Sequence, residues 1–121
     1  MSSLESLPEL QSRLREFARE RDWEQFHTPK NMAMALVVEA AELVELFQWL
    51  TPEASAQLDD DALSEAAQEI ADVQIYLARL ADILGIDILK ACDAKLAINR
   101  EKYPVEQVKG SARKYTHYAD R

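Results

Sequence analysis

In residues 32–47, MAMALVVEAAELVELF, three glutamates are the only polar residues. Glu39, Glu42 and Glu45 follow one another at steps of three, so at about 100° per residue they share an arc of roughly 120° on a helix. The rest of the circumference is apolar, whereas a helix at a protein surface needs only one apolar stripe. The run therefore predicts a helix that other helices cover on more than one side.

A second run, residues 62–84, has the same character. Its polar stripe, spaced as one face of a helix, consists of Glu65, Glu69, Asp72, Tyr76 and Arg79. Apolar residues fill most of the positions between them. Residues 31–78 hold ten acidic residues and no Lys or Arg, so the carboxylates of the two runs have no cation beside them before Arg79.

The rest of the chain also has helical periodicity, and two glycines and four prolines leave little material for the tight turns of a β-sandwich or barrel. Thr28, Thr51 and Asp59 are helix-start signals, whereas Gly85 and Pro104 are stop signals. We expect helices at residues 8–22, 29–49, 59–84 and 87–102, a helical turn at 51–58 and an irregular, flexible basic tail over about 105–121. These elements predict an all-α fold of the four-helix bundle type, in a single domain over residues 1–121.

The four helices of one chain are too few to cover the apolar surfaces of both runs. We therefore expect a homo-oligomer, either a dimer or a tetramer, in which a second copy covers the rest. The net charge of −8 argues against nucleic acid as a partner. No apolar run reaches the roughly 18 residues of a membrane span, and the first ten residues lack a signal-peptide pattern. The single cysteine, Cys92, excludes an internal disulfide. We therefore expect a cytoplasmic protein.

The two runs offer four carboxylates in pairs one turn apart: Glu39, Glu42, Glu69 and Asp72. Antiparallel packing would direct all four into one cleft, where partly buried like charges are costly unless something neutralises them. Mg²⁺ prefers carboxylate and water ligands and would remove this conflict. The alternative is a solvated acidic stripe without a ligand. A di-iron bundle is disfavoured because it uses Glu-x-x-His pairs, and the only histidines, His27 and His117, lie outside both runs.

Two groups of motifs resemble a known family. The acidic pattern EAAELVE at 39–45, followed by EIAD at 69–72, resembles the signature of the MazG-like superfamily of all-α nucleoside triphosphate pyrophosphatases. A resemblance to its dCTP pyrophosphatase branch rests on RDWEQFH at 21–27, PKN at 29–31, ELFQW at 45–49, Lys95, Asn99, KYP at 102–104, GS at 110–111 and KY at 114–115. These motifs extend over nearly the whole chain.

The resemblance implies a hydrolase that uses Mg²⁺ to cleave a nucleoside triphosphate, dCTP or a modified dCTP, to a monophosphate and pyrophosphate, and so cleans the nucleotide pool. It implies that Glu39, Glu42, Glu69 and Asp72 bind the Mg²⁺, which screens the triphosphate charge and activates a water. Glu45 would act as a base on that water or support the metal ligands, which makes Glu39, Glu42 and Glu45 the expected catalytic residues.

The resemblance also implies a set of substrate contacts. Phosphate or sugar contacts are expected from Tyr76, Lys95, Asn99 and Tyr103, and base contacts from Trp23, His27 and Trp49. From the residues alone, each has an ordinary alternative: an exposed Lys–Asn pair, buried tyrosines, tryptophans as hydrophobic anchors and a loop histidine. The basic tail is expected to fold over the triphosphate, or else to be a solvated terminus.

Two other functions stay open at this point. One is a non-catalytic helical adaptor whose acidic groove binds a basic partner. The other is a hydrolase of the same superfamily that acts on another nucleotide, such as dUTP or a phosphoribosyl nucleotide. Product analysis across a nucleotide panel separates these alternatives.

Overall fold

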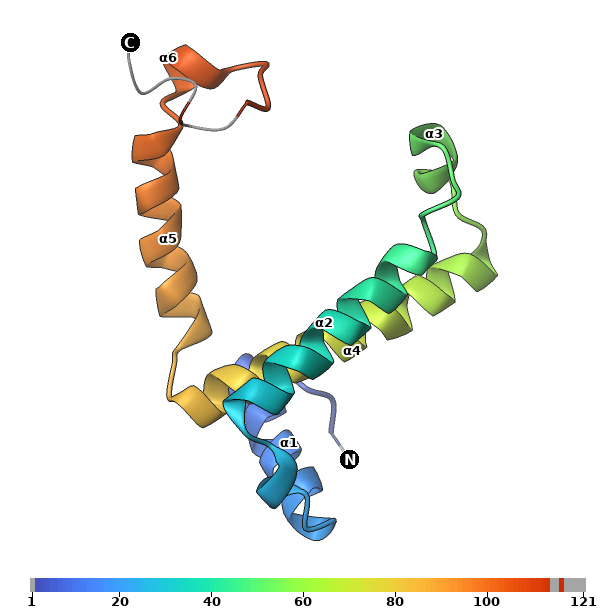
Figure 1. Cartoon of the computed structure of the whole chain (residues 1–121), viewed down its shortest axis with the longest axis vertical. Coiled ribbons are helices and arrows are strands. Elements are labelled where there is room, and N and C mark those ends of the chain that lie inside the picture. The colour runs from blue at the N-terminus through green and yellow to red at the C-terminus, as the bar shows by residue number, and fades with distance from the viewer. Residues whose placement is uncertain (1, 114–115, 117–121) are drawn as a thin grey trace. The chain divides into compact units, whose positions relative to one another are not determined.

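The computed structural model describes residues 2–113 and residue 116. Within them the regular secondary structure is helical, and no strand is present. The elements are α1 (Leu7–Glu20), the 3-10 helix η1 (Glu24–Phe26), α2 (Pro29–Glu45), α3 (Pro52–Ser55), α4 (Asp60–Leu84), α5 (Ile88–Lys102) and α6 (Val105–Val108) (Figure 1). The all-α prediction is confirmed. The chain divides into two compact units, residues 1–86 and residues 87–121, and each is described by itself.

The helix starts follow the predicted cap residues. The Thr28 hydroxyl accepts a hydrogen bond from the backbone N–H of Asn31 at 3.1 Å, and the Asp59 carboxylate accepts one from Ala62 at 2.8 Å. Such side chains satisfy N–H groups that the first turn of a helix leaves unpaired. At its other end α4 stops at Gly85, whose φ of 68° is left-handed, as predicted.

The end of α2 differs from the prediction. The helix stops at Glu45 instead of continuing to Trp49, and the next residues form turns in which Leu46 donates to the Leu43 carbonyl at 3.2 Å and Leu50 to that of Phe47 at 2.9 Å. Pro52 sets only the outer limit of the helix, because a residue before proline is driven out of the helical region. Thr51, before Pro52, has an extended ψ of 160° and caps α3.

The chain after Pro104 also differs from the irregular segment that was predicted. Pro104 is extended, with φ −60° and ψ 135°, and its carbonyl accepts hydrogen bonds from Gln107 at 3.0 Å and Val108 at 3.1 Å, which starts the single turn of α6. Residues 114, 115 and 117–121 lie outside the described residues, which include Lys109 and Arg113 of the basic tail but not Lys114, and the contact of this tail with a triphosphate stays a prediction. Whether residues 105–121 are flexible stays a prediction.

The first unit is organised around α4. Helix α2 runs antiparallel along it, and α1 packs against its second half (Figure 1). Gln11 on α1 donates a hydrogen bond to the Ala78 carbonyl of α4 at 3.0 Å. The buried apolar side chains of the described residues are small apart from one methionine: Ala18, Met32, Ala66, Ala78 and Ala81. Because alanine lets helix backbones approach closely, the facing side chains of α2 and α4 come within reach of one another.

Much apolar surface stays exposed in the chain. Val37 on α2 is 67% exposed, and other exposed apolar residues are Met34, Val38, Val44, Leu63, Ile70, Leu77, Leu84, Leu89, Leu96 and Ile98. Within the described residues, no helix combines the length and the hydropathy needed to cross a membrane.

Candidate active site

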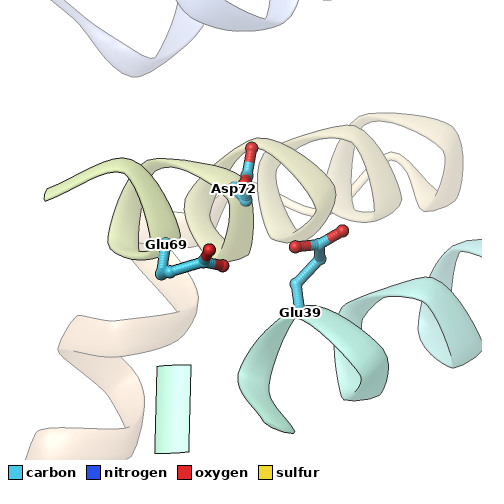
Figure 2. Close-up of side chains that lie close together, drawn as sticks. All are labelled: Glu39, Glu69 and Asp72. Atoms are coloured by element: carbon cyan, nitrogen blue, oxygen red, sulfur yellow. The ribbon is translucent and has the colours of Figure 1, made fainter. Parts of the chain in front are cut away.

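Glu39 on α2 faces Glu69 and Asp72 on α4 at the contact between the two helices (Figure 2). Each side chain offers one carboxylate oxygen, and these three oxygens all lie within 4.8 Å of one another. The antiparallel packing of α2 and α4 creates this group, because it sets one turn of each helix against the other. The structure thus brings together three of the four carboxylates that the sequence indicates as metal ligands.

Two oxygens of this group are buried without a hydrogen-bond partner among the described residues: Glu39 Oε2 and Glu69 Oε2. Burial raises the pKa of Glu39, and the neighbouring carboxyl of Glu42 and the charges of Asp72 and Glu69 raise it further. Burial likewise raises the pKa of Glu69, with the charges of Glu42 and Asp72 adding to the effect. Both carboxylates therefore carry an unfavourable charge that lacks a compensating cation.

Glu42 and Glu45 lie at the edge of this group. Glu42 is exposed, one turn after Glu39 on α2, and its effect on the pKa of both Glu39 and Glu69 places its carboxyl beside them. Glu45 is the exposed last residue of α2, and its charge also raises the pKa of Glu69. The roles of both residues as metal ligand or base stay predictions.

The three carboxylates provide the oxygen ligands that hard divalent cations prefer. Oxygen ligands stand about 2.0–2.6 Å from Mg²⁺ or Ca²⁺, so two ligands on opposite sides of the ion are about 4–5 Å apart. The oxygens of Glu39, Glu69 and Asp72 fall within that span. A cation would also give the two buried oxygens the partner that they lack and would cancel the repulsion between the carboxylates. These residues therefore fit a metal ion.

A cavity of about 240 Å³ lies further along α4, lined by Leu14, Phe17, Trp23, His27, Met32, Ile75, Tyr76 and Arg79. Tyr76 comes four residues after Asp72 on α4, a rise of about 6 Å, so the pocket begins one helical turn from the carboxylates. Three of the predicted substrate contacts, Trp23, His27 and Tyr76, line this pocket together. The lining is aromatic and aliphatic with few polar groups, which is typical of a small-molecule pocket.

The aromatic wall is built by the turn that ends α1. Trp23 donates its backbone N–H to the Ala18 carbonyl at 2.9 Å and Asp22 to that of Arg19 at 3.1 Å, with Asp22 left-handed at φ 55°. This is a Schellman-type helix end, which reverses the chain sharply. It brings Trp23 edge-on to Phe17, with ring centroids 5.8 Å apart.

The polar part of the pocket joins α4 to the turn before α2. Arg79 donates its Nε–H to Nδ1 of His27 at 3.2 Å, and its Nη1 lies 3.4 Å from Oδ2 of Asp82. Burial lowers the pKa of His27, and the positive charge of Arg79 lowers it further, against a smaller opposing effect of Glu24. Both effects favour the neutral form of the imidazole.

Four predicted substrate contacts do not line this pocket. Trp49, in the turns after α2, is 88% exposed. Lys95 and Asn99 stand one turn apart on α5, as predicted. Tyr103 caps the end of that helix, and its backbone N–H donates a hydrogen bond to the Asn99 carbonyl at 2.9 Å. These three residues belong to the second unit, and their roles toward a substrate stay predictions.

Sequence reasoning did not assign five lining residues to the pocket: Leu14, Phe17, Met32, Ile75 and Arg79. The four apolar ones have the periodicity of core residues, and nothing local distinguishes a pocket wall from a core. Arg79 does carry a signal, because it is the only Lys or Arg between Lys30 and Lys90. A lone cation on an otherwise apolar and acidic helix needs a partner, and His27 and Asp82 are its partners.

The fold and the site define an all-α protein with a carboxylate group on two antiparallel helices, next to an aromatic pocket. A model of the MazG-like family matches residues 34–117, and the chain belongs to that family. The resemblance noted from the motifs is therefore confirmed.

The chain is similar to dCTP pyrophosphatase 1 of several mammals. It is 48% identical to the protein of Rattus norvegicus and 47% to that of Homo sapiens, in each case over 106 residues that cover 84% of this chain and 61% of the relative. It is 44% identical to the protein of Bos taurus over 120 residues, which cover 95% of this chain and 69% of the relative. The chain thus spans about three fifths of the length of the rat and human relatives.

Among solved structures, the chain is similar to the crystal structure of a pyrophosphatase from Archaeoglobus fulgidus, with a TM-score of 0.78 and 38% sequence identity. The match covers 86% of this chain and 97% of the archaeal chain. Because so much of both chains superposes, the all-α fold described above is the fold of this family.

Proposed function

We propose that this protein is a Mg²⁺-dependent nucleoside triphosphate pyrophosphohydrolase that converts dCTP, or a modified dCTP, to the monophosphate and pyrophosphate. The observation that carries the proposal is the group formed by Glu39, Glu69 and Asp72, in which two buried carboxylate oxygens have no partner. The similarity to dCTP pyrophosphatase 1 of rat and human supports the choice of reaction and base.

In this proposal Glu39, Glu69 and Asp72, with Glu42 at the edge, hold the metal ion by their carboxylates. A bound Mg²⁺ supplies charge screening for the phosphates and lowers the pKa of a coordinated water. Glu45, at the open end of α2, is the candidate base that accepts a proton from the attacking water. The carboxylates alone would repel a triphosphate, so the chain depends on the cation to admit its substrate.

The aromatic pocket takes the base of the nucleotide. Trp23 and Tyr76 offer ring faces and edges, and His27 offers a polar ring nitrogen. In this proposal the base lies beside the phosphates, because Tyr76 is about one helical turn from Asp72. Lys95, Asn99 and Tyr103 are proposed as phosphate or sugar contacts, and Trp49 as a further base contact.

A homo-oligomer, dimer or tetramer, is also part of this proposal. Three valines of α2 and four large apolar residues of α4 are exposed, and a second copy of the chain would bury them: Val37, Val38, Val44, Leu63, Ile70, Leu77 and Leu84. We further propose a cytoplasmic enzyme that removes unwanted deoxynucleotides from the pool.

A nucleotide panel tests the proposal. The protein is incubated with each dNTP, with 5-methyl-dCTP and with a phosphoribosyl nucleotide, with Mg²⁺ or with EDTA, and the products are resolved by ion-exchange chromatography. We expect dCMP and pyrophosphate from dCTP only when Mg²⁺ is present. Appearance of dCDP and orthophosphate would contradict the reaction, preferential cleavage of dUTP would reassign the substrate, and no turnover of any nucleotide would leave a non-catalytic helical adaptor as the better description.

A further inference from the structure

The guanidinium of Arg79, in the aromatic pocket, lies between two polar partners, His27 and Asp82. The Arg79 side chain is only 11% exposed, its Nε–H points to Nδ1 of His27 at 3.2 Å, and its Nη1 lies 3.4 Å from Asp82. Asp82 in turn accepts a hydrogen bond from Arg15 of α1 at 2.6 Å. The guanidinium therefore has little freedom, and α1, α4 and the turn at His27 meet around it.

This contact restricts the protonation of His27. A neutral imidazole has one ring nitrogen that accepts and one that donates, whereas an imidazolium donates from both. Because Arg79 donates to Nδ1, that nitrogen carries no proton, and the single ring proton must be on Nε2. Within the described residues no other hydrogen bond to the His27 ring is present, so Nε2 keeps its N–H for another partner.

We propose that Arg79 is a positioning residue that fixes His27 as the neutral Nε2–H tautomer, so that the pocket offers a constant hydrogen-bond donor to an acceptor atom on a planar heterocyclic ring. Cytosine carries such acceptors at O2 and N3. The identity of the ring rests on the proposed function, but the tautomer of His27 does not.

The charges around His27 favour the same state. Burial and the cation of Arg79 both lower the pKa of the imidazole, and Glu24 on η1 opposes them more weakly. Asp82 is shared between Arg79 and Arg15, so its charge is already neutralised before it can stabilise an imidazolium. The pocket thus keeps the same single N–H donor on His27 down to a pH below the pKa of an ordinary histidine.

Nuclear magnetic resonance of the ¹⁵N-labelled full chain tests the tautomer directly. Long-range ¹H–¹⁵N correlation spectra distinguish Nδ1–H from Nε2–H, and a His117→Gln variant assigns the signals of His27. We expect the Nε2–H pattern at pH 7 and a titration midpoint below about 6.5, the value of an unperturbed histidine. An Nδ1–H pattern, or a midpoint at or above 6.5, would overturn the proposal without the need for any variant at Arg79.

Variants at Arg79 then test the consequence for binding. Arg79→Met removes the donor and the charge at similar length, Arg79→Lys keeps the charge, and Arg19→Met is a matched control at an exposed arginine that pairs with Glu16 outside the pocket. The probe is deoxycytidine, which has no phosphate and so needs no metal, measured by calorimetry at pH 6.0 and 7.5.

For Arg79→Met we expect about tenfold weaker binding at pH 7.5, the loss of roughly one hydrogen bond, and a larger loss at pH 6.0. The midpoint of His27 should rise in the same variant, Arg79→Lys should restore part of the affinity, and Arg19→Met should bind like the unmodified protein. Equal affinity of Arg79→Met and the unmodified protein at both pH values would overturn the proposal.

The two proposals fail separately. A protein that shows the Nε2–H tautomer, and loses it in Arg79→Met, but turns over no nucleotide would contradict the proposed function alone. A protein that hydrolyses dCTP but has His27 in the Nδ1–H form would contradict the role of Arg79 alone.

Discussion

Glu39 on α2 and Glu69 on α4 each have a buried Oε2 atom with no hydrogen-bond partner among the described residues, although the two helices that carry them pack against each other. Buried polar atoms normally find a partner, and one that does not calls for an explanation, such as a catalytic role or a bound ion. The stability of the α2–α4 pair and the proposed chemistry therefore depend on the same two carboxylates.

The first prediction concerns the metal-free protein and pH. The pKa of Glu39 and of Glu69 is raised in the folded state, mainly by burial. The folded protein therefore binds these protons more tightly than the unfolded chain, and the stabilisation, present below the unfolded pKa, is lost as pH rises through the folded pKa. Differential scanning fluorimetry in the presence of EDTA measures the effect. We expect Tm to decrease as the pH is raised from mildly acidic to neutral.

Mg²⁺ should reverse this loss. At tenfold its Kd, a ligand of the folded state contributes about 1.4 kcal/mol, or roughly 5–6 °C in Tm for a domain of this size. We expect the Tm increase on adding Mg²⁺ to be larger at pH 7.5 than at pH 5, because protonated carboxyls bind the cation poorly. An equal increase at both pH values would argue against carboxylate ligands.

The second prediction is that Glu69→Gln stabilises the metal-free protein and abolishes its activity. The substitution removes one buried charge from the group and keeps the shape of the side chain, so repulsion with Glu39 and Asp72 decreases. Mg²⁺ should then no longer raise Tm, and turnover of dCTP should fall by about a hundredfold or more, because even residues behind the metal ligands typically cost 10–100-fold when mutated. Glu65→Gln, at an exposed position one turn earlier on α4, is the control and should behave like the unmodified protein.

The third prediction separates the two exposed glutamates of α2. Glu42→Gln should abolish turnover and weaken Mg²⁺ binding, because its carboxyl stands beside those of Glu39 and Glu69. Glu45→Gln should lower kcat by about a hundredfold or more while the Mg²⁺ affinity stays within a few-fold, as expected for loss of a base. Steady-state kinetics and calorimetry with Mg²⁺ give both values. An unaffected kcat in Glu45→Gln would remove this residue from the proposed chemistry.

The fourth prediction concerns the exposed apolar surface. Val37, 67% exposed on α2, should lie in the interface between copies of the chain. Val37→Lys introduces a charge that is costly to bury, so sedimentation velocity should show a smaller species than for the unmodified protein. The control is Gln68→Lys, at an exposed polar position of α4. A monomeric unmodified protein at micromolar concentration would contradict the proposed oligomer.

The helix starts could be predicted because their causes are local. Thr28, Asp59 and Asp87 each bond to a backbone N–H only three residues away, and Gly85 ends α4 by its own backbone conformation. The carboxylate group could also be predicted, because the spacing of Glu69 and Asp72 places both on one face of α4 and the missing cations implied a shared neutraliser. Such arguments fail at the end of α2, where turns before Thr51 replaced the expected helix.

The amino-acid order alone was enough to establish an all-α chain with paired acids on two apolar helices, since helical periodicity and caps act over a few residues. The pocket and its polar core required the folded chain. Arg79 and His27 are 52 residues apart, and their hydrogen bond exists only after the Schellman turn of α1 and the packing of α1 on α4 bring them together. Leu14 and Ile75 could not be distinguished from core residues beforehand, because an apolar side chain has the same periodicity whether its neighbour is another side chain or a cavity.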